Sequence, residues 1–366
     1  MFDIQFVMRS QQLKRRIASN PETILDRLSV VEEFEWMRSE NPFVFNIEVT
    51  NNCNMRCIMC PRTSLMTRKI KSIGTNTFEK VLEQITPYSN ETLTTFGHWV
   101  EDELKVSPAE ESEDHFYYFI LAGALNLHGY GETMIDPNVV QRVQACTDRG
   151  FPSYFSCVPA NIKPDRTLEL MKAGLSYLKF ALESLDDDRQ REIRGKRADF
   201  TNAFEKIKKA VKLKKVHQQD TLLIGTMLEM SNTPEHHNMH MEFQKLMRGE
   251  GIYSYIKTQD NRWLHEETSV ERKGAPKEYC EYPWTSLTVM ADGNVVPCTQ
   301  DYDCEMVMGN VYEQSLDEIW NGKKYKEFRR SHILGDFPKE FKCASRCDNA
   351  MVCDRLDGKV LTRRVM

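Results

Sequence analysis

The sequence has no run of about 20 consecutive apolar residues, so it predicts no helix that spans a membrane. It has no basic excess either: 49 Lys and Arg stand against 54 Asp and Glu, a net charge of −5, which argues against nucleic acid as a partner. The N-terminus places a short apolar run before its basic residues, the reverse of a secretory signal. We therefore expect a cytoplasmic protein with no membrane partner.

A disulfide framework is not expected, although the chain contains 11 cysteines. In a reducing cytosol, clustered thiols more often hold metal. Nine of the eleven fall into two clusters, one at residues 53–60 and one at residues 280–353. With 366 residues and 40% hydrophobic content, the chain is long enough for a well-filled core and for more than one domain.

Three regions differ in their pattern. Residues 1–44 predict an N-terminal helical segment with apolar residues at helical spacing. Strand and helix patterns alternate over residues 45–260, and such βα units predict a parallel sheet covered by helices. About six units fit there, fewer than the eight of a closed barrel. Residues 261–366 predict a hairpin at Asp292-Gly293, one helix capped by Ser315 and a small cysteine-rich domain.

One stretch interrupts the alternation. Residues 90–119 are acidic and show no clear periodicity. A loop of this length in a compact domain is usually functional or mobile. The sequence therefore predicts an insertion, and leaves open whether it is merely solvated or forms a lid over a substrate.

The first cysteine cluster places three thiols in eight positions: Cys53, Cys57 and Cys60. A structural zinc site closes with four ligands, and no His or Cys in the next thirty residues offers the fourth. Each iron of an iron–sulfur cube normally takes one thiolate, so three cysteines leave one iron open. An open metal position is typical of a reactive cofactor, while zinc remains the alternative.

The spacing Cys53-x3-Cys57-x2-Cys60 resembles the CxxxCxxC signature of radical S-adenosylmethionine (SAM) enzymes. The resemblance implies an α/β fold with a partial (β/α)6 TIM-like barrel, and a [4Fe–4S] cluster whose open iron binds the amino and carboxylate groups of SAM. Reductive cleavage of SAM then gives a 5′-deoxyadenosyl radical that abstracts hydrogen from a small-molecule substrate. It also implies a reducing partner such as flavodoxin or ferredoxin, and it places Met59 near the adenine.

Further residues resemble SAM contacts of the same family. Glycines at the end of a strand let backbone approach a ligand closely. The stretch of Gly129, Tyr130, Gly131 and Glu132 resembles the family's GGE motif, whose carbonyls and Glu receive the SAM amino group. The resemblance also makes candidates, for the SAM carboxylate or ribose, of polar residues at later strand ends: Ser156, Glu183, Ser184 and Thr226. For Glu183, an ordinary carboxylate in a surface loop is an equal alternative.

The second cysteine cluster resembles the SPASM/twitch extension of radical SAM enzymes, on the element Gly293-x4-Cys298 and the helix that follows. That resemblance implies a small C-terminal α+β domain with one auxiliary [4Fe–4S] cluster; a second cluster remains an alternative, as does a zinc site. The expected ligands are Cys280, Cys298, Cys343 and Cys347. Cys353 could replace either of the last two, and Cys304 is a bystander or a ligand to a partly open site.

The resemblance predicts an oxidoreductase, similar to twitch dehydrogenases of aminocyclitol biosynthesis. It would oxidise a sugar or aminocyclitol type of substrate, with the auxiliary cluster as electron acceptor. One alternative is a radical SAM epimerase or peptide-modifying enzyme in which Cys157, near the end of the third strand, returns a hydrogen atom. Another is a non-catalytic scaffold stapled by zinc.

Overall fold

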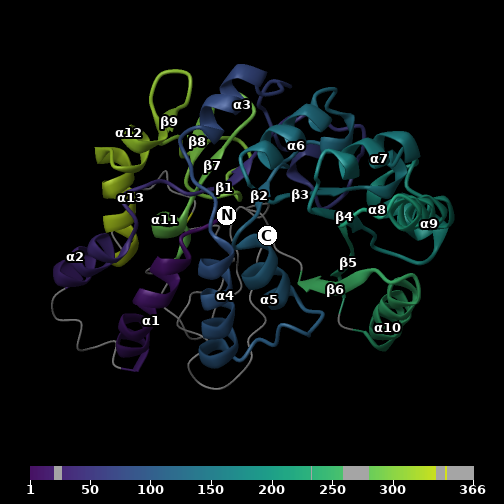
Figure 1. The fold of residues 1–366 in the computed structure, drawn as a ribbon, viewed down its shortest axis with the longest axis horizontal. Helices are drawn as coiled ribbons and strands as arrows, with labels where there is room; N and C mark the ends of the chain where they lie inside the picture. Colours follow the sequence, from purple (N-terminus) through teal and green to yellow (C-terminus); the bar gives the residue numbers. More distant parts are fainter. Residues whose placement is uncertain (20–26, 232, 259–279, 335–342, 344–366) are drawn as a thin grey trace.

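One nine-stranded sheet organises the computed structural model, which describes residues 1–19, 27–231, 233–258, 280–334 and 343. The strand order is β6-β5-β4-β3-β2-β1-β7-β8-β9, and β1 to β6 run parallel, each beside the next in the chain. These six strands form an arc (Figure 1). Their bounds are β1 (Val44–Ile47), β2 (Leu125–Asn126), β3 (Ser153–Cys157), β4 (Tyr177–Ala181), β5 (Leu222–Glu229) and β6 (Tyr253–Thr258). The predicted parallel α/β sheet is confirmed.

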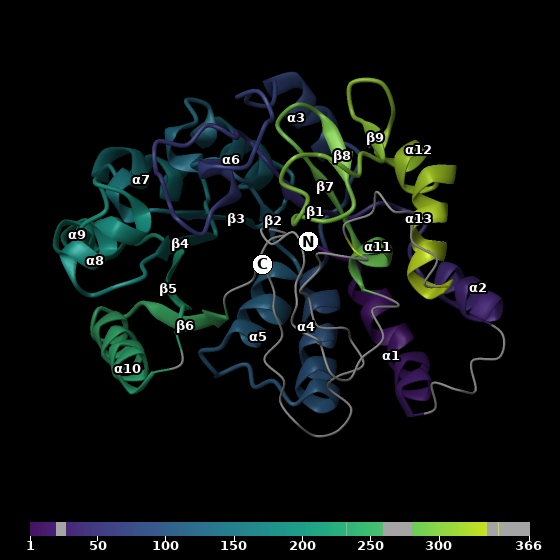
Figure 2. The same cartoon turned by 180° about the vertical axis from the view of Figure 1, so that it is seen from behind.

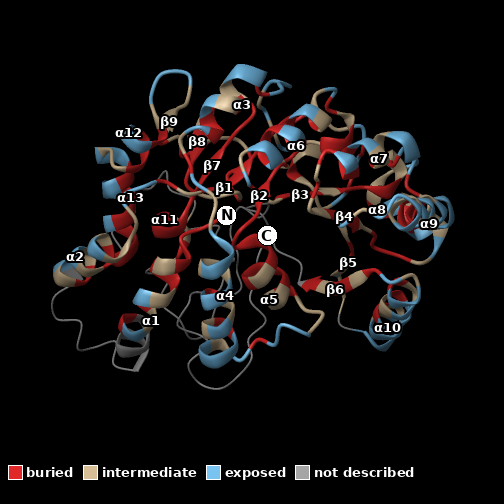
Figure 3. Ribbon diagram, in the orientation of Figure 1, coloured by how far each residue is buried: buried red, intermediate tan, exposed pale blue. Residues whose placement is uncertain are grey.

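Helices cover the outer side of the arc, with exposed faces turned away from the sheet (Figure 3). This alternation of buried and exposed faces is what the sequence periodicity predicts. The outer helices are α3 (Thr75–Leu82), α6 (Val139–Asp148), α7 (Pro164–Lys172), α8 (Asp187–Arg194), α9 (Phe200–Val216) and α10 (Pro234–Gly249). Of these, α8 was not expected, since its strongly polar sequence carries only two buried side chains, Gln190 and Ile193.

The insertion is helical and packs against the inner side of the arc, as Figures 1 and 2 both show for α4 and α5. It consists of α4 (Asn90–Trp99), the π-helix η3 (Val100–Leu104), α5 (Glu113–His115) and the π-helix η4 (Phe116–Leu121). Of the two alternatives that the sequence left open, a solvated loop is therefore wrong. The reason is that π-turns do not keep the 3.6-residue period on which the sequence prediction relied.

The insertion fills the base of the sheet with aromatic side chains. Phe116, Tyr117 and Tyr118 are each at most 4% exposed. The Phe116 ring packs against Tyr154 of β3 and Tyr255 of β6, with ring centroids 5.3 and 5.1 Å apart. The insertion thus forms a floor inside the barrel and not a lid over it.

The N-terminal region is helical, as predicted, and forms α1 (Ile4–Ser19) and α2 (Arg27–Met37). Both pack on the C-terminal part of the chain. The rings of Phe6 and Phe34 lie 6.1 and 5.1 Å from that of Trp284 in α11 (Tyr282–Thr285).

The C-terminal region extends the same sheet on the other side of β1. β7 (Leu287–Val289) pairs parallel with β1, and β8 (Asn294–Val296) pairs antiparallel with β7, which confirms the predicted hairpin. Gly293 takes a φ of +86° in the turn, a conformation that favours glycine. The short strand β9 (Gly309–Asn310) completes the sheet. The predicted boundary near residue 261 lies outside the described residues, so this division remains a prediction.

The single helix expected after Ser315 is two helices, α12 (Leu316–Trp320) and α13 (Lys323–Leu334). Ser315 caps the first in a capping box with Glu318, as its position predicted. The break falls at Asn321 and Gly322. Three short 3₁₀ turns complete the described structure: η2 (Pro61–Thr63), η5 (Thr133–Ile135) and η6 (Pro159–Asn161). Among the described residues, no helix is long and apolar enough to cross a membrane.

Candidate active site

The three clustered cysteines lie in the loop that follows β1. Cys57 is buried, while Cys53 and Cys60 are partly exposed. The loop is held against the end of α8, where the Ile58 N–H donates to the Ile193 carbonyl at 2.9 Å. Within the loop, the Thr63 hydroxyl donates to the Cys57 carbonyl at 2.8 Å. These bonds fix the backbone around the cysteines.

One cavity of about 1050 Å³, partly open to solvent, brings the cysteines together with the other predicted SAM contacts. It lies where the parallel strands end, the usual position of active sites in such barrels. Among the residues predicted between β1 and β5 to bind the cluster, SAM or the substrate, all but Ser184 line this cavity. They are Cys53, Cys57, Met59, Cys60, Gly129, Tyr130, Gly131, Glu132, Ser156, Cys157, Glu183 and Thr226. The Ser184 hydroxyl instead accepts the Asp186 N–H at 3.1 Å, in the turn that leads into α8.

The two glycines of the GGE-like stretch allow close backbone contact. A Cβ at Gly131 would lie 2.0 Å from the carbonyl oxygen of Thr50, in the loop that leads to Cys53. A Cβ at Gly129 would lie 2.6 Å from the Glu48 side chain. Both positions therefore require glycine. A side chain at Gly131 would push the cysteine loop away from the stretch that follows β2, and one at Gly129 would displace the buried Glu48 side chain.

Glu132 is buried at the cavity wall and is 3% exposed. Its carboxylate accepts the backbone N–H groups of Val158 and Met134 at 3.0 and 3.3 Å. Burial raises the Glu132 pKa to about 7. A carboxylate held this way fits the amino group of SAM, whose positive charge would favour the ionised form.

Glu183 is not in a surface loop: it is 3% exposed and forms an ion pair with Arg194 at the end of α8. Its second oxygen accepts the Leu228 N–H at 2.8 Å. Arg194 Nη1 also lies 3.5 Å from Cys57 Sγ. Although burial by itself lowers the Arg194 pKa, Glu183 and Cys57 raise it above its ordinary value. Sequence reasoning missed Arg194, since only the packing of α8 brings it to the cysteines.

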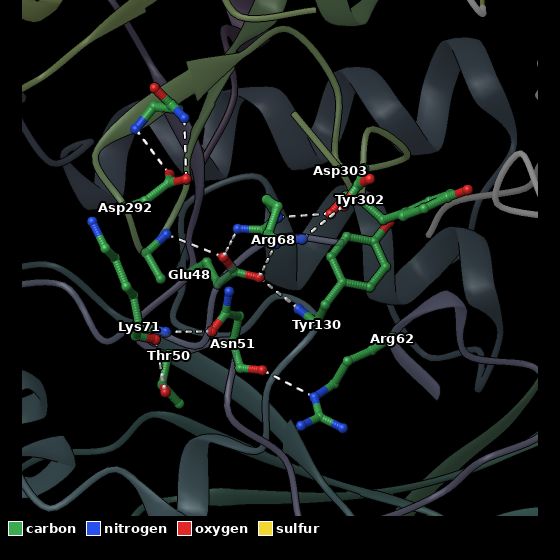
Figure 4. A network of polar contacts seen from close by, with 12 residues as sticks. Glu48, Thr50, Asn51, Arg62, Arg68, Lys71, Tyr130, Asp292, Tyr302 and Asp303 are labelled. Atoms are coloured by element: carbon green, nitrogen blue, oxygen red, sulfur yellow. Dashed lines mark hydrogen bonds and ion pairs between the residues drawn. The ribbon is translucent and has the colours of Figure 1, made fainter. Parts of the chain in front are cut away.

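A third buried carboxylate, Glu48, joins the cysteine loop to the C-terminal region (Figure 4). Arg68 donates to both of its oxygens, at 2.8 and 2.9 Å. The N–H groups of Tyr130 and Ala291 donate to the same carboxylate at 3.0 and 3.1 Å. Glu48 therefore connects three distant segments: Arg68 follows the cysteine loop, Tyr130 follows β2, and Ala291 follows β7.

The auxiliary cysteines are only partly described. Cys280 and Cys298 both lie near the Tyr325 hydroxyl. Burial raises the pKa of that hydroxyl, Arg329 lowers it, and the two cysteines raise it further. Cys304 lies elsewhere, beside Arg68, with a φ of +57°. Cys343 packs against the main core, and Cys347 and Cys353 lie outside the described residues.

The donor chemistry fits iron–sulfur clusters. Within the described ranges, no three His, Cys, Asp or Glu side chains converge closely enough to hold one metal ion. A zinc ion needs such convergence, because all its ligands bind one atom. In an iron–sulfur cube each cysteine binds a different iron, so the thiols stand farther apart.

A second, much smaller pocket adjoins the first and shares three lining residues with it. It lies between β1, β2 and β7, and its lining is mostly polar and uncharged. The lining includes Asn46, Asn126, His128 and Thr288, together with Thr299 from the C-terminal region. The Tyr130 hydroxyl donates to the Thr299 carbonyl at 2.6 Å. The SAM-side cavity and the C-terminal region thus meet at Tyr130.

Known proteins are similar to this chain in parts. One relative is the S-adenosyl-L-methionine-dependent 2-deoxy-scyllo-inosamine dehydrogenase of Niallia circulans, 37% identical over 73 residues. That match covers 20% of this chain and 29% of the relative, so it spans less than a third of that protein.

Among solved structures, Streptococcus suis SuiB is similar with a TM-score of 0.55 and 13% identity, over 83% of this chain and 71% of SuiB. A structure of BtrN in complex with AdoMet and 2-DOIA is similar over 79% of this chain and 86% of BtrN, with 16% identity and a TM-score of 0.43. At such identities, the SuiB likeness speaks for the fold alone.

Two family models match the chain. The iron–sulfur cluster-binding domain SPASM matches residues 280–348, which hold five of the six C-terminal cysteines. The radical SAM superfamily matches residues 47–231, half of the chain. The chain therefore belongs to the radical SAM superfamily, and its cofactors are SAM, the SAM-binding [4Fe–4S] cluster and the auxiliary iron–sulfur of a SPASM domain.

Proposed function

We propose that this radical SAM enzyme oxidises a small polar substrate of sugar or aminocyclitol type by removing hydrogen from one of its carbons. The observation that carries the proposal is the pair of adjoining cavities, one containing the three cysteines and the other reaching the C-terminal region at Thr299. A substrate held between them would have the SAM site on one side and the auxiliary domain on the other.

On the SAM side, Cys53, Cys57 and Cys60 would hold the [4Fe–4S] cluster. When bound, that cluster and SAM supply a 5′-deoxyadenosyl radical. Glu132 would accept the SAM amino group, and Arg194 would fix the orientation of Cys57 through its bond to Sγ. Four residues that line the same cavity stay proposed neighbours of SAM: Met59, Ser156, Glu183 and Thr226. Ser184 is proposed as the residue that follows Glu183, although it does not line the cavity.

On the auxiliary side, we propose one [4Fe–4S] cluster on Cys280, Cys298, Cys343 and Cys347, with Cys353 as alternative ligand. The shared proximity of Cys280 and Cys298 to Tyr325 supports this set. The separate position of Cys304 supports its assignment as a bystander. Such a cluster would accept the electron left on the substrate, and a flavodoxin or ferredoxin would reduce the SAM-binding cluster.

The uncharged amides and hydroxyls of the second cavity suit a hydroxylated substrate. Asn46 and Asn126 are register partners on β1 and β2 and both line this cavity. Amide side chains both donate and accept hydrogen bonds, as do the hydroxyls of sugars and cyclitols. This lining favours a small polar substrate over an apolar one.

The test is anaerobic turnover of the reconstituted protein with dithionite, SAM and a panel of sugars and cyclitols. We expect 5′-deoxyadenosine that carries deuterium from a labelled substrate, and a product with two hydrogens fewer. The Cys57→Ala variant should form no 5′-deoxyadenosine. Equal 5′-deoxyadenosine formation by that variant would contradict the proposal, as would a colourless protein after reconstitution with iron and sulfide.

A second candidate is an epimerase, favoured by Cys157. This residue lines the cavity and is 2% exposed. Burial raises the pKa of its thiol well above the ordinary value, which keeps the S–H hydrogen that an epimerase would donate. In deuterium oxide an epimerase would place deuterium in a product of unchanged oxidation state, and Cys157→Ala would abolish that product. A dehydrogenase would show neither effect.

A further inference from the structure

Three polar side chains form a row across the inner face of the sheet. Asn126 on β2, Asn46 on β1 and Thr288 on β7 are register partners on neighbouring strands. They are 7%, 3% and 2% exposed, and all three line the second cavity. Neighbouring strands lie about 4.8 Å apart, so the side chains of register partners on one face are close neighbours. The row therefore places three hydrogen-bonding groups side by side on one wall of this cavity.

The residues that flank this row along the strands are apolar and belong to the opposite face. Leu125 and Leu127 flank Asn126, and both are part of the main hydrophobic core. Ile47, which follows Asn46, is part of the same core. Buried positions are mostly apolar, because a buried polar group costs free energy unless it is hydrogen-bonded. The polar row therefore needs partners that offset this cost.

Most hydrogen-bonding side chains of this cavity have no partner in the protein. Among the described residues, neither the Asn46 amide nor the Thr288 hydroxyl has a hydrogen-bond partner. Thr299 Oγ1, in the loop after β8, is buried and has no partner either. Asn126 differs, since its side-chain oxygen accepts the His128 N–H at 3.3 Å. Native proteins leave few buried polar groups unpaired, so three around one small cavity point to a bound polar group that completes them.

The lining of the second cavity is polar but not charged. Among the described residues that form it, none is Asp, Glu, Lys or Arg. The nearby carboxylate of Glu48 is already bound to Arg68 and to the N–H groups of Tyr130 and Ala291. An ammonium or carboxylate group would therefore lose its water here without gaining an opposite charge. A hydroxyl group suits this lining, because it donates and accepts hydrogen bonds, as amides and Thr hydroxyls do.

The row lies beside the cavity that contains the cluster cysteines. The two cavities share His128, Gly129 and Tyr130. Asn126 precedes His128 by two residues, which along a strand correspond to about 6.6 Å, so the row lies below the strand ends. Because the second cavity is much the smaller, a ring held in the first cavity could extend one substituent into the second.

We infer that Asn46 and Thr288, together with Thr299, bind one uncharged hydroxyl group of the substrate. This inference rests on the proposed function and narrows its substrate class: the substituent that faces the C-terminal region is a hydroxyl and not an amine or an acidic group. Asn46, in the middle of the row, is the specificity-determining residue. A substrate that lacks this hydroxyl leaves the amide unpaired and binds less tightly.

The first test asks whether Asn46 supports the fold, and it needs no substrate. Asn46→Leu keeps the branched shape of the side chain but removes an unpaired amide, so the urea midpoint of the reconstituted holoenzyme should stay unchanged or rise. Asn126→Leu is the matched comparison on the neighbouring strand. It removes the acceptor of the His128 N–H, so it should lower the midpoint. A clear fall for Asn46→Leu would show a structural role and overturn the inference.

The second test is equilibrium dialysis of the reconstituted holoenzyme, saturated with SAM, against radiolabelled myo-inositol and D-glucose. We expect saturable binding of at least one of these neutral polyols, weakened roughly tenfold or more in Asn46→Leu, because a lost hydrogen bond leaves the buried hydroxyl of the ligand unpaired. The matched control Asn76→Leu changes an exposed residue of α3 and should leave the affinity unchanged.

Equal binding by the wild type and Asn46→Leu would overturn the inference. The absence of saturable binding of both polyols would overturn it as well, and would mean that the cavity holds only water. Formation of 5′-deoxyadenosine from SAM and dithionite is measured on the same preparation. Polyol binding that depends on Asn46, in a protein that never cleaves SAM, would refute the proposed function and leave the hydroxyl site standing. Cleavage of SAM without such binding would do the reverse.

Discussion

At the residue scale, the site depends on close contacts that tolerate no added atom. Gly131 lies so near the loop leading to Cys53 that a Cβ would overlap the Thr50 carbonyl oxygen. The sequence indicated a glycine-rich turn there, and the structure identifies its partner. Arg194 is the opposite case, because no motif in its own segment indicated a place in the site. Only its contacts with Glu183 and Cys57 in the folded chain make it a candidate site residue.

Gly131→Ala should displace the cysteine loop. We expect it to lower the free energy of unfolding by about 1–3 kcal/mol, the usual cost of overpacking, and to reduce the iron bound after reconstitution. Gly249→Ala is the matched control, because nothing lies within 4 Å of the added Cβ at the end of α10. It should be neutral, or stabilise by about 0.5–1 kcal/mol. Equal effects of the two changes on urea unfolding would argue against the close contact at Gly131.

At the element scale, the insertion changes most between expectation and structure. Its acidic composition suggested a solvated segment, but Ser89 and Ser112 cap its helices and its aromatic residues face the sheet. Its exposed acidic side chains, Glu91 and those of residues 101–103, lie on the outer surface of α4 and η3, whereas Glu113 is buried. Composition averaged over 30 residues could not separate these two faces.

Phe116→Ala tests whether the insertion is a structural floor. Since Phe116 is 2% exposed and packs on Tyr154 and Tyr255, its loss should cost about 3–5 kcal/mol of unfolding free energy. Phe119→Ala, at a half-buried position of the same π-helix, should cost clearly less. Urea unfolding followed by circular dichroism measures both costs. A change in unfolding free energy near zero for Phe116→Ala would indicate that the insertion is solvated and does not support the sheet.

Helix α13 carries a buried histidine that makes stability depend on pH. Burial lowers the His332 pKa from 6.5 to about 4, so the unfolded chain binds a proton that the folded chain resists. Stability should therefore be complete above pH 6.5 and fall by about 3 kcal/mol as the pH drops to about 4.

His332→Gln should remove this part of the pH dependence of urea unfolding. His217→Gln, at an exposed position after α9, should keep it. The same pH slope in both variants would mean that another group is responsible.

At the scale of the whole molecule, Glu48 and Arg68 join the two halves of the enzyme. Both side chains are at most 5% exposed, and the pair is bound on one side to Tyr130 and on the other to Ala291. β7 and β8 continue the sheet of the barrel, so this ion pair lies inside a continuous structure and not at a loose interface. Geometry at the first cysteine loop is thus coupled to the C-terminal region.

Glu48→Gln should lower the free energy of unfolding by about 3–5 kcal/mol, because it leaves the buried guanidinium of Arg68 without its charge partner. The double change Glu48→Leu with Arg68→Met should cost less than the sum of the two single changes. Asp188→Asn breaks an exposed ion pair with Arg191 and should cost no more than about 1 kcal/mol. Additive costs at Glu48 and Arg68 would show that the pair does not couple the two segments.

Local patterns sufficed for much of the site. The spacing of Cys53, Cys57 and Cys60 and the GGE-like stretch predicted residues that the fold does place in one cavity. The hairpin at Gly293 and the cap at Ser315 were also readable, since each depends on a few neighbouring residues. The ligand set of the auxiliary cluster remains a prediction, because Cys347 and Cys353 lie outside the described residues.

The sequence by itself determined that the sheet is parallel, because strand and helix periodicity is local, and its cysteine spacing pointed to the cofactors through the resemblance to radical SAM enzymes. The individual SAM contacts remain predictions. Only the tertiary structure decided that the insertion is a floor and that Arg194 reaches Cys57. Each of these depends on segments far apart in the chain meeting across the sheet. The burial and the charge of a side chain in such places depend on tertiary packing, so they cannot be predicted from one local segment of the sequence.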